Sequence, residues 1–506
     1  MRTTALLLLL AVAAPAADWP FGPKAGFRGR DLYNLGLIGA KAVDAAAAPP
    51  SNAPPQQGRR SFQVDRSGGD EGPARLRIEL LYPEGPAQEA GIVPGDVVVG
   101  AGGKKFRKEP LAELAKALLK AESTKGVLVL LVQKGGAGKA QKVEVTIPVS
   151  PVGKAAAKPT VGDGRKLLWE AGLAWLAKRQ PNDGGFRETL SGKNGAVVQT
   201  AMAGLAWLGG GSDLENGPYK DNVRRAADWL AENVTKLGDG KAGERGTKAS
   251  WSQSNWGYAH AAIFLGELHA RTPDRGVLTA LHYCAKRLLE TQEASGGWAH
   301  GPGGPNALGY VELNIVTGLA LGGLGLAQRS GFELPEEPIQ RAEAYLIESG
   351  SGDGGVGYST KPGQKGQGNI GRSAGSWLGY LALGRGKKPF GKKLGSYAAR
   401  HADEVLGGHA SLMQHILLAG VAAHVSGKAA TKSYWAQCGR DLVLARAPDG
   451  SFQPRPWAES LGMGSNSDVS FGEVWTTAAW TVVLVSQPVK DGAVGFPAWS
   501  GRPAKK

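Results

Sequence analysis

The stretch that decides the fold is residues 288–327, LLETQEASGGWAHGPGGPNALGYVELNIVTGLALGGLGLA. Its first residues have helical spacing and end at a turn, QEASGGW, over residues 292–298. A Gly/Pro loop follows, and a long, almost wholly apolar helix is expected to begin at Asn306. The same arrangement recurs on both sides of this stretch, so the sequence predicts a fold built from helical hairpins.

Amphipathic helices alternate with apolar helices from residue 165 to residue 487. The amphipathic helices are expected to begin near Arg165, Asp221, Val277, Pro338, Lys393 and Lys432, and the apolar helices near Ala196, Asn255, Asn306, Gly371, His409 and Ser467. An apolar helix is not covered by its own partner alone, so neighbouring pairs must bury it. A closed ring buries every pair, whereas an open solenoid needs polar capping repeats. We therefore expect an all-α (α/α)6 toroid of six helical hairpins over residues 165–487.

The turn motif resembles the glutamine-tryptophan repeat of the squalene and terpenoid cyclase superfamily. Its clearest copy is Gly172-x-x-Trp175-Leu176-x-x-x-Gln180-x-x-x-Gly184-x-Phe186, and residues 285–298 form a variant that is one residue shorter. Gly350 and Arg446 stand in place of the glutamine in two further copies. The Asp-x-Asp-Asp motif of squalene cyclases is absent. The resemblance therefore implies the toroid fold without terpene cyclase activity.

Residues 31–149 resemble a PDZ domain. The most specific segment is GPAQEAGIVPGDVV over residues 85–98, with strands expected at 75–81, 127–133 and 143–149 and a helix at 110–121. In PDZ domains a hydrophobic-Gly-hydrophobic loop binds a peptide carboxylate, and the next strand edge accepts the peptide. Leu35, Gly36 and Leu37 match that loop, so the resemblance implies a peptide or protein tail as partner. A buried turn without a ligand is the alternative.

The expected organisation has five parts: a signal peptide (1–17), a small α+β PDZ-like domain (31–149) with a low-complexity insertion at about 44–60, a linker (150–164), the toroid (165–487) and a C-terminal tail (488–506). Arg2, the apolar run 5–14 and the A-x-A pattern at 14–16 indicate the signal peptide. A secreted or periplasmic protein follows, with no membrane span after cleavage. The segments 34–40, 192–195 and 408–411 resemble an exported bacterial family that combines both domains and has no securely attached activity.

The formal net charge of +15 favours an anionic glycan or another cell-envelope ligand over nucleic acid in an exported protein. A merely solubilising surface explains the charge equally well. Cys284 and Cys438 fall inside helical patterns and are expected to be buried thiols. A dinucleotide-like spacing at residues 350–355 ends a helix instead of following a strand. We therefore expect no cofactor and no metal.

Titratable residues recur at one depth in the apolar helices. Counting six positions in from Asn194, Ser254, Asn306, Asn369, His409 and Ser467, at the apparent helix starts, reaches Thr200, His260, Glu312, Gly375, His415 and Glu473. A six-fold ring would set His260 across from His415, and Glu312 across from Glu473. Paired carboxylates hydrolyse glycosidic bonds, and a His/Glu set serves a lyase. The alternative is that each residue is bonded to a neighbouring helix end.

Two functions therefore remain open. The first is an exported protein- or ligand-binding scaffold of the cell envelope. The second is a carbohydrate-active hydrolase or lyase acting on an anionic polysaccharide at the rim of the apolar helices, with Glu312, Glu473, His260 and His415 as catalytic residues. The sequence leaves open which of them applies.

Overall fold

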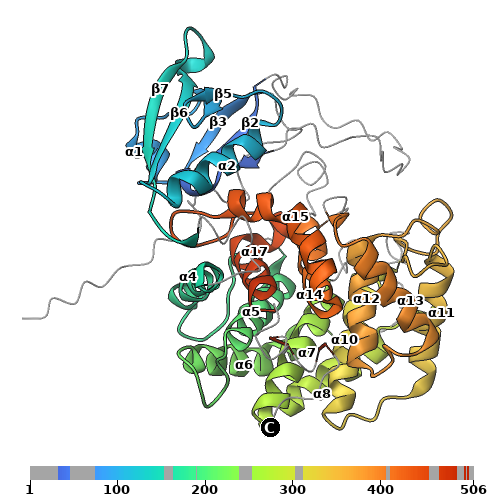
Figure 1. Cartoon of the computed structure of the whole chain (residues 1–506). Helices are drawn as coiled ribbons and strands as arrows, with labels where there is room; N and C mark the ends of the chain where they lie inside the picture. Colours follow the sequence, from blue (N-terminus) through green and yellow to red (C-terminus); the bar gives the residue numbers. More distant parts are fainter. Residues whose placement is uncertain are drawn as a thin grey trace, which may run out of the picture.

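The computed structural model describes residues 32–45, 75–152, 163–189, 191–238, 253–302, 312–405, 411–454, 467–486, 495–496 and 499–500. The expected signal peptide lies outside these residues, as do nearly all of the low-complexity insertion and most of the linker and of the C-terminal tail. A small antiparallel sheet, hereafter the sheet unit, is followed by a largely helical region from residue 163 to residue 486 (Figure 1).

The described strands of the sheet unit are β1 (Tyr33–Asn34), β2 (Ala40–Asp44), β3 (Leu76–Leu81), β4 (Val97–Ala101), β5 (Lys104–Lys105), β6 (Val127–Gln133) and β7 (Gln141–Thr146). They form one antiparallel sheet in the order β1-β2-β3-β4-β6-β7, with β5 on β4. The helix α2 (Pro110–Glu122) packs against β4 and β6 and buries Leu114 and Leu118. A 3-10 turn, η2 (Gly36–Ile38), joins β1 to β2, and a short helix, α1 (Pro86–Glu89), precedes β4. The expected helix 110–121 and strand 127–133 are confirmed.

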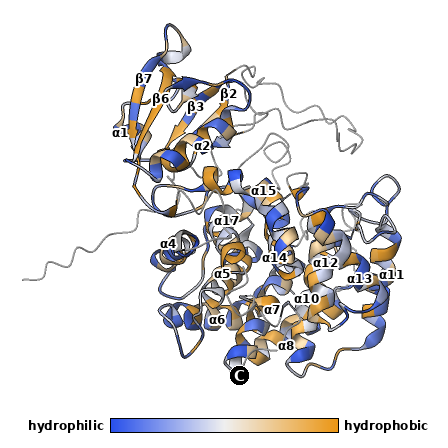
Figure 2. Cartoon of the chain, viewed as in Figure 1, coloured by the Kyte–Doolittle hydropathy of each residue, from blue (hydrophilic) through white to orange (hydrophobic). Residues whose placement is uncertain are grey.

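Amphipathic and apolar helices alternate through the helical region, as the sequence predicts. The amphipathic helices are α4 (Asp163–Arg179), α6 (Lys220–Asn233), α8 (Arg275–Glu290), α11 (Glu336–Ser349), α13 (Pro389–Arg400) and α15 (Lys428–Ala445). The apolar helices are α5 (Gly192–Gly209), α7 (Ser254–Arg271), α10 (Asn314–Arg329), α12 (Ile370–Ala382), α14 (Leu412–Ser426) and α17 (Ser467–Val485). Figure 2 shows hydrophilic residues along α4 and α6 and hydrophobic residues along α5.

The apolar helices pack against one another in chain order. Helix α5 contacts α7, α7 contacts α10, α10 contacts α12, α12 contacts α14, and α14 contacts α17. Helix α17 in turn packs against α5, and the Gln199 side chain on α5 donates a hydrogen bond to the Phe471 carbonyl on α17. The last described helix therefore covers the first apolar helix.

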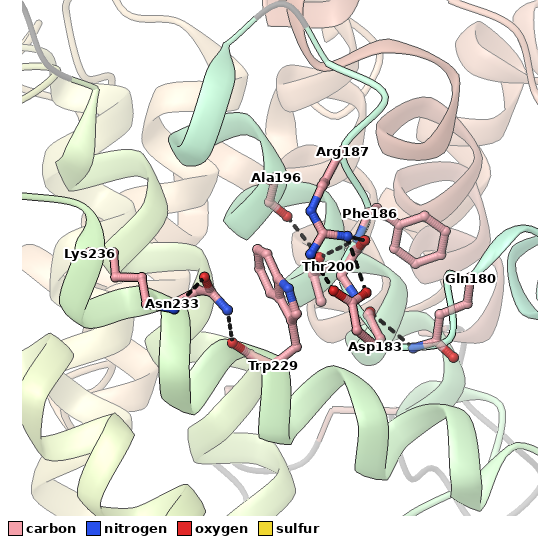
Figure 3. Close-up of polar contacts among 11 residues, drawn as sticks. Gln180, Asp183, Phe186, Arg187, Ala196, Thr200, Trp229, Asn233 and Lys236 are labelled. Carbon is pink, nitrogen blue, oxygen red and sulfur yellow. Dashed lines mark hydrogen bonds and ion pairs between the residues drawn. The ribbon is translucent and has the colours of Figure 1, made fainter. Parts of the chain in front are cut away.

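The turn that contains the glutamine motif connects each pair to the next pair (Figure 3). Gln180 Nε2 donates to the Gly184 carbonyl inside its own turn at 3.1 Å and to the Asn222 carbonyl of α6 at 3.0 Å. Gln292 repeats this in the third pair, donating to the Gly296 and Pro338 carbonyls, each at 2.8 Å. The motif glutamine thus satisfies carbonyls of two successive pairs, which gives the sequence motif its structural role.

A second hydrogen bond ties each of these turns to the apolar helix that follows it. The Phe186 N–H donates to Thr200 Oγ1 at 3.0 Å, and that hydroxyl donates to the Ala196 carbonyl at 2.8 Å (Figure 3). Equivalent bonds join Trp298 to Thr317, Val356 to Ser373 and Phe452 to Thr477, at 3.1, 2.8 and 3.0 Å. A hydroxyl therefore recurs at this helix position because it accepts a hydrogen bond from a backbone N–H of the preceding turn.

Helix α10 begins at Asn314, so the expectation of a helix continuous from Asn306 was wrong at residues 312 and 313. The Leu313 N–H donates to the Trp298 carbonyl at 2.8 Å, and the Tyr345 hydroxyl donates to the Glu312 carbonyl at 2.8 Å. These bonds hold both residues outside the helix, and the backbone of Leu313 is extended. Asn306 itself lies outside the described residues, and so does His409, where the fifth apolar helix was expected to begin.

Cys284 and Cys438 are buried free thiols, as predicted. Among the residues that the structure describes, no helix is both long and apolar enough to cross a membrane.

Candidate functional site

Helix α15 lies against the sheet unit, along α2 and beside η2 (Figure 1). At one end of α2, Arg446 donates two hydrogen bonds to the Glu122 carboxylate, at 2.7 and 2.9 Å. The Arg446 and Glu122 side chains are only 12% and 2% exposed. At the other end of α2, Arg440 lies 3.6 Å from the Glu109 carboxylate. Two ion pairs therefore align the end of α15 with α2.

The expected peptide-binding loop faces this same helix. Leu35, Gly36 and Leu37 are buried, and the Leu35 N–H donates to the Ala40 carbonyl at 3.0 Å. A Cβ atom at Gly36 would lie 3.0 Å from the Val443 carbonyl of α15. At Lys41 and Ala42, the adjacent strand β2 pairs with β1 on one edge and with β3 on the other. A peptide at the loop would therefore have to displace α15.

Glu473 lies where the helical region meets the sheet unit. Gly472 has a φ of 77° and interrupts α17, so the regular helix resumes at Glu473. Its carboxylate accepts hydrogen bonds from Ser451 Oγ at 3.0 Å and from Gln453 Nε2. Burial raises the pKa of Glu473 to about 7, with Asp449 adding to the rise and Arg179 opposing it. This carboxyl group therefore holds its proton to a higher pH than an ordinary glutamate does.

Lys41 of β2 is buried on the other side of the same contact. Its ammonium group donates to the Pro454 carbonyl at 3.4 Å. Burial lowers the pKa of Lys41 to about 7, and the negative charge of Glu473 opposes the shift. We call Lys41, Asp449, Ser451, Gln453 and Glu473 the junction cluster. It places an acid and an amine that both titrate near neutrality between the two parts of the chain.

Asp449 orders the loop that carries the junction cluster. Its carboxylate accepts hydrogen bonds from Trp175 Nε1 at 2.6 Å and from Ser451 Oγ at 2.7 Å. Burial raises the pKa of the Tyr82 hydroxyl of the sheet unit, and its hydrogen bond to Asp449 adds to the rise. Tyr82 therefore stays protonated and keeps Asp449 as its acceptor.

His260 lies among aromatic side chains at the start of α7 and α17. Its Nδ1 bonds the Trp256 carbonyl at 2.8 Å, so the neutral ring presents a lone pair at Nε2. Trp256 stacks on the ring at 6.1 Å between centroids, and Trp475 meets it edge-on at 5.6 Å. Burial lowers the pKa of His260 to about 4, although the Gln414 side chain favours the protonated form. His260 is therefore neutral at physiological pH.

The four residues expected to pair across the ring have the following described contacts. The residue of α14 that approaches His260 is Gln414, whereas the neighbouring His415 packs against Gly371 of α12. Glu312 lies beside Gly297 and Tyr345, in contacts separate from those of Glu473. Among the described residues, no cluster of His, Cys, Asp and Glu side chains is arranged to hold a metal ion.

Sequence reasoning missed Lys41 and Gln453 as members of the site. Lys41 stands in the short strand AKAVD, whose other residues are mostly apolar, and a lysine at a buried strand position is an unusual feature. Gln453 carries no comparable mark in the sequence. Its side chain bonds Ser451 and Glu473, and its carbonyl meets Asn34, which is 419 positions away.

The described architecture defines a protein with a small antiparallel sheet unit joined through a buried polar cluster to a largely helical region. Residues 191–486, more than half of the chain, match the family model described as a domain of unknown function, DUF6288. The chain therefore belongs to the DUF6288 family. A comparison with curated proteins finds no match.

Proposed function

We propose that this protein is an exported binding or scaffold protein of the cell envelope, in which a PDZ-like unit and a closed (α/α)6 toroid act as one body. The contact between α17 and α5 supports closure of the ring. A further contact does so as well, because a Cβ at Gly450, in the last turn, would lie 3.4 Å from the Ala171 carbonyl of the first amphipathic helix. The ion pair between Arg446 and Glu122 supports the single body.

A binding function is supported by the contacts of the four candidate catalytic residues, each of which bonds to different partners. Glu473 bonds Ser451 and Gln453, the Glu312 carbonyl holds Tyr345, His260 bonds its own helix, and His415 fills the space beside Gly371. Glycoside hydrolysis of the expected kind needs two carboxyl groups flanking one glycosidic bond. Their separate contacts favour binding without turnover.

The excess of positive charge makes anionic glycans the first ligands to test. Purified full-length protein is screened against acidic and neutral polysaccharides for binding and for release of reducing ends. Binding of the acidic glycans without turnover is the expected result. Equal affinity for neutral and acidic glycans would reject the charge argument.

Glu473 supports a carbohydrate-active enzyme as the second candidate. A carboxyl group with a pKa of about 7 is suited to act as a general acid near neutral pH. If the screen detects turnover, Glu473→Gln abolishes it under this candidate. Glu312→Gln is the matched control, because Glu312 lies in other contacts and its loss leaves the activity in place.

Export is tested by expressing the whole chain in a bacterial host and measuring the mass of the recovered protein by mass spectrometry. Removal of residues 1–17 with recovery outside the cytoplasm supports export. An intact N-terminus in the cytoplasm contradicts it.

A further inference from the structure

A pocket opens beside the junction cluster, between the sheet unit and the helical region. Tyr33 and Asn34 of β1 and Leu111 of α2 form one wall, and residues of α14, α15 and α17 form the others. Small-molecule sites in proteins often occur between domains. The pocket therefore has the position of a ligand site.

Most of the pocket wall is apolar. Met413 and Ile416 of α14, Leu444 of α15 and Trp480 of α17 line it together with Leu111. Each of these side chains is buried in the fold. Such a wall suits the hydrocarbon or aromatic body of a ligand about the size of an amino-acid side chain.

Two hydrogen-bond acceptors in the wall have no partner. Asn34 turns Nδ2 to the Gln453 and Pro454 carbonyls, and its Oδ1 accepts no hydrogen bond from the described residues. Gln453 turns Nε2 to Ser451 and Glu473, and its Oε1 is likewise without a donor. The two residues are only 7% and 5% exposed. A buried acceptor without a donor is destabilising, so a ligand that brings donors binds favourably here.

The remaining polar groups of the wall favour a positive ligand over a negative one. The side chains of Asp441 and Asp468 both line the pocket. Asp468 accepts hydrogen bonds from Ser411 Oγ at 2.9 Å and from the Met413 N–H at 3.0 Å. Arg440 is the cation of the wall, and it lies 3.6 Å from Glu109. The lining is thus rich in acceptors although the whole chain carries a formal charge of +15.

We propose that this pocket binds a small amphipathic amine. Its ammonium group donates hydrogen bonds to Asn34 Oδ1 and Gln453 Oε1, and its apolar body lies against Met413, Ile416 and Trp480. This site is separate from any glycan-binding surface, so its test stands apart from the test of the proposed function.

The first test compares three probes of similar shape by titration calorimetry on the full chain. Phenethylammonium carries a positive donor head, 2-phenylethanol a neutral head and 3-phenylpropionate a negative head. We expect phenethylammonium to bind, the alcohol to bind at least about tenfold more weakly, and the carboxylate not to bind, because hydrogen bonds to charged groups contribute about 1.5–3 kcal/mol. Equal binding of all three probes, or no binding of the amine, overturns the proposal.

Variants then locate the site. Ala445→Leu fills the pocket from α15 without removing a polar group and is expected to abolish amine binding. Gln453→Met removes one acceptor at nearly constant volume and is expected to weaken binding about tenfold or more. Gln340→Met, the same change at an exposed position of α11, leaves the affinity unchanged.

Thermal unfolding establishes which variants remain folded. Unaltered affinity in folded Ala445→Leu protein would place the amine elsewhere and reject the site. If Gln453→Met fails to fold, Ala445→Leu and the three-probe series on the unaltered protein still decide the outcome.

Discussion

Arg446 and Glu122 form a two-point ion pair between residues that are 324 positions apart in the sequence. It is the more buried of the two ion pairs that join α15 to the sheet unit, with side chains 12% and 2% exposed. A buried ion pair is sensitive to the loss of one partner, because the remaining charge has left water without compensation.

Removal of the arginine is therefore expected to destabilise the protein strongly. Arg446→Met should lower the free energy of unfolding by about 3–5 kcal/mol, because Glu122 keeps a buried charge. The double variant Arg446→Met with Glu122→Leu should recover much of that loss. Chemical denaturation measures both. Lys166→Gln, which breaks an exposed pair with Glu170, is the control and should cost less than about 1 kcal/mol. A loss for Arg446→Met no greater than the control's would show that the junction does not depend on this pair.

Gly36 should be intolerant of a side chain because α15 lies against it. Gly36 has a φ of 69°, and a Cβ atom there would meet the Leu118 side chain at 2.9 Å and the Val443 carbonyl at 3.0 Å. Gly91 has a φ of 73° and nothing within 4 Å of the same atom. Both Ala variants carry the backbone penalty of about 1 kcal/mol, and only Gly36→Ala adds a clash. We expect Gly36→Ala to melt several degrees below Gly91→Ala in thermal unfolding. Equal melting temperatures would show that α15 moves away from the new side chain without loss of stability, which contradicts the prediction.

The junction cluster should give the stability a minimum near neutral pH. Folding raises the pKa of Glu473 from 4.5 to about 7, so the folded state binds more protons than the unfolded chain between these values and stability falls as the pH rises. Folding lowers the pKa of Lys41 from 10.5 to about 7, so the folded state binds fewer protons above pH 7 and stability rises again.

Single variants separate the two limbs of this pH profile. Glu473→Gln should flatten the limb below pH 7, leaving a smaller slope from Asp468, whose pKa burial raises to about 6. Lys41→Met should flatten the limb above pH 7. Denaturation at a series of pH values provides the measurement, and a profile unchanged in both variants is inconsistent with titration at the cluster.

Gln292 should contribute more to the stability of the protein than a residue in a turn usually does. It donates to two carbonyls, and Arg341 donates to its Oε1 at 2.7 Å. Gln292→Met removes the donor to both carbonyls and is expected to cost about 2–3 kcal/mol in the free energy of unfolding. Gln340→Met repeats the substitution at an exposed position and should change stability by less than about 0.5 kcal/mol. Similar losses for the two variants would contradict the role of the turn.

The alternation of helices could be predicted from the sequence because a buried helix appears as a continuous run of uncharged residues. The stretch 195–208 contains no charge, and every one of its residues is buried in α5. The glutamine turn was equally readable, since Gln180 and Gln292 stand at matching spacings and make matching bonds. These features depend on residues within one or two hairpins.

The site was only partly predictable, because its residues meet through the fold. Glu473 was identified from its position in an apolar helix, yet its neighbour Lys41 belongs to another part of the chain. Glu312 was assigned to the same depth because the Gly/Pro loop gave no sign of where α10 begins. A shift of eight residues, from Asn306 to Asn314, moved it off the helix. Gln414, which directly precedes His415, was not singled out, although its side chain approaches His260.

The hydrogen bond from Gln199 to the Phe471 carbonyl has a consequence for folding during synthesis, because it joins an early helix to the last described one. Helix α5 is made early, but one of its faces stays exposed until the chain has been extended by about 270 further residues and α17 has formed. Contacts of such long sequence separation form late and slowly. A nascent or truncated chain therefore displays an apolar helix that chaperones and proteases recognise, and only the last helix removes it from their reach.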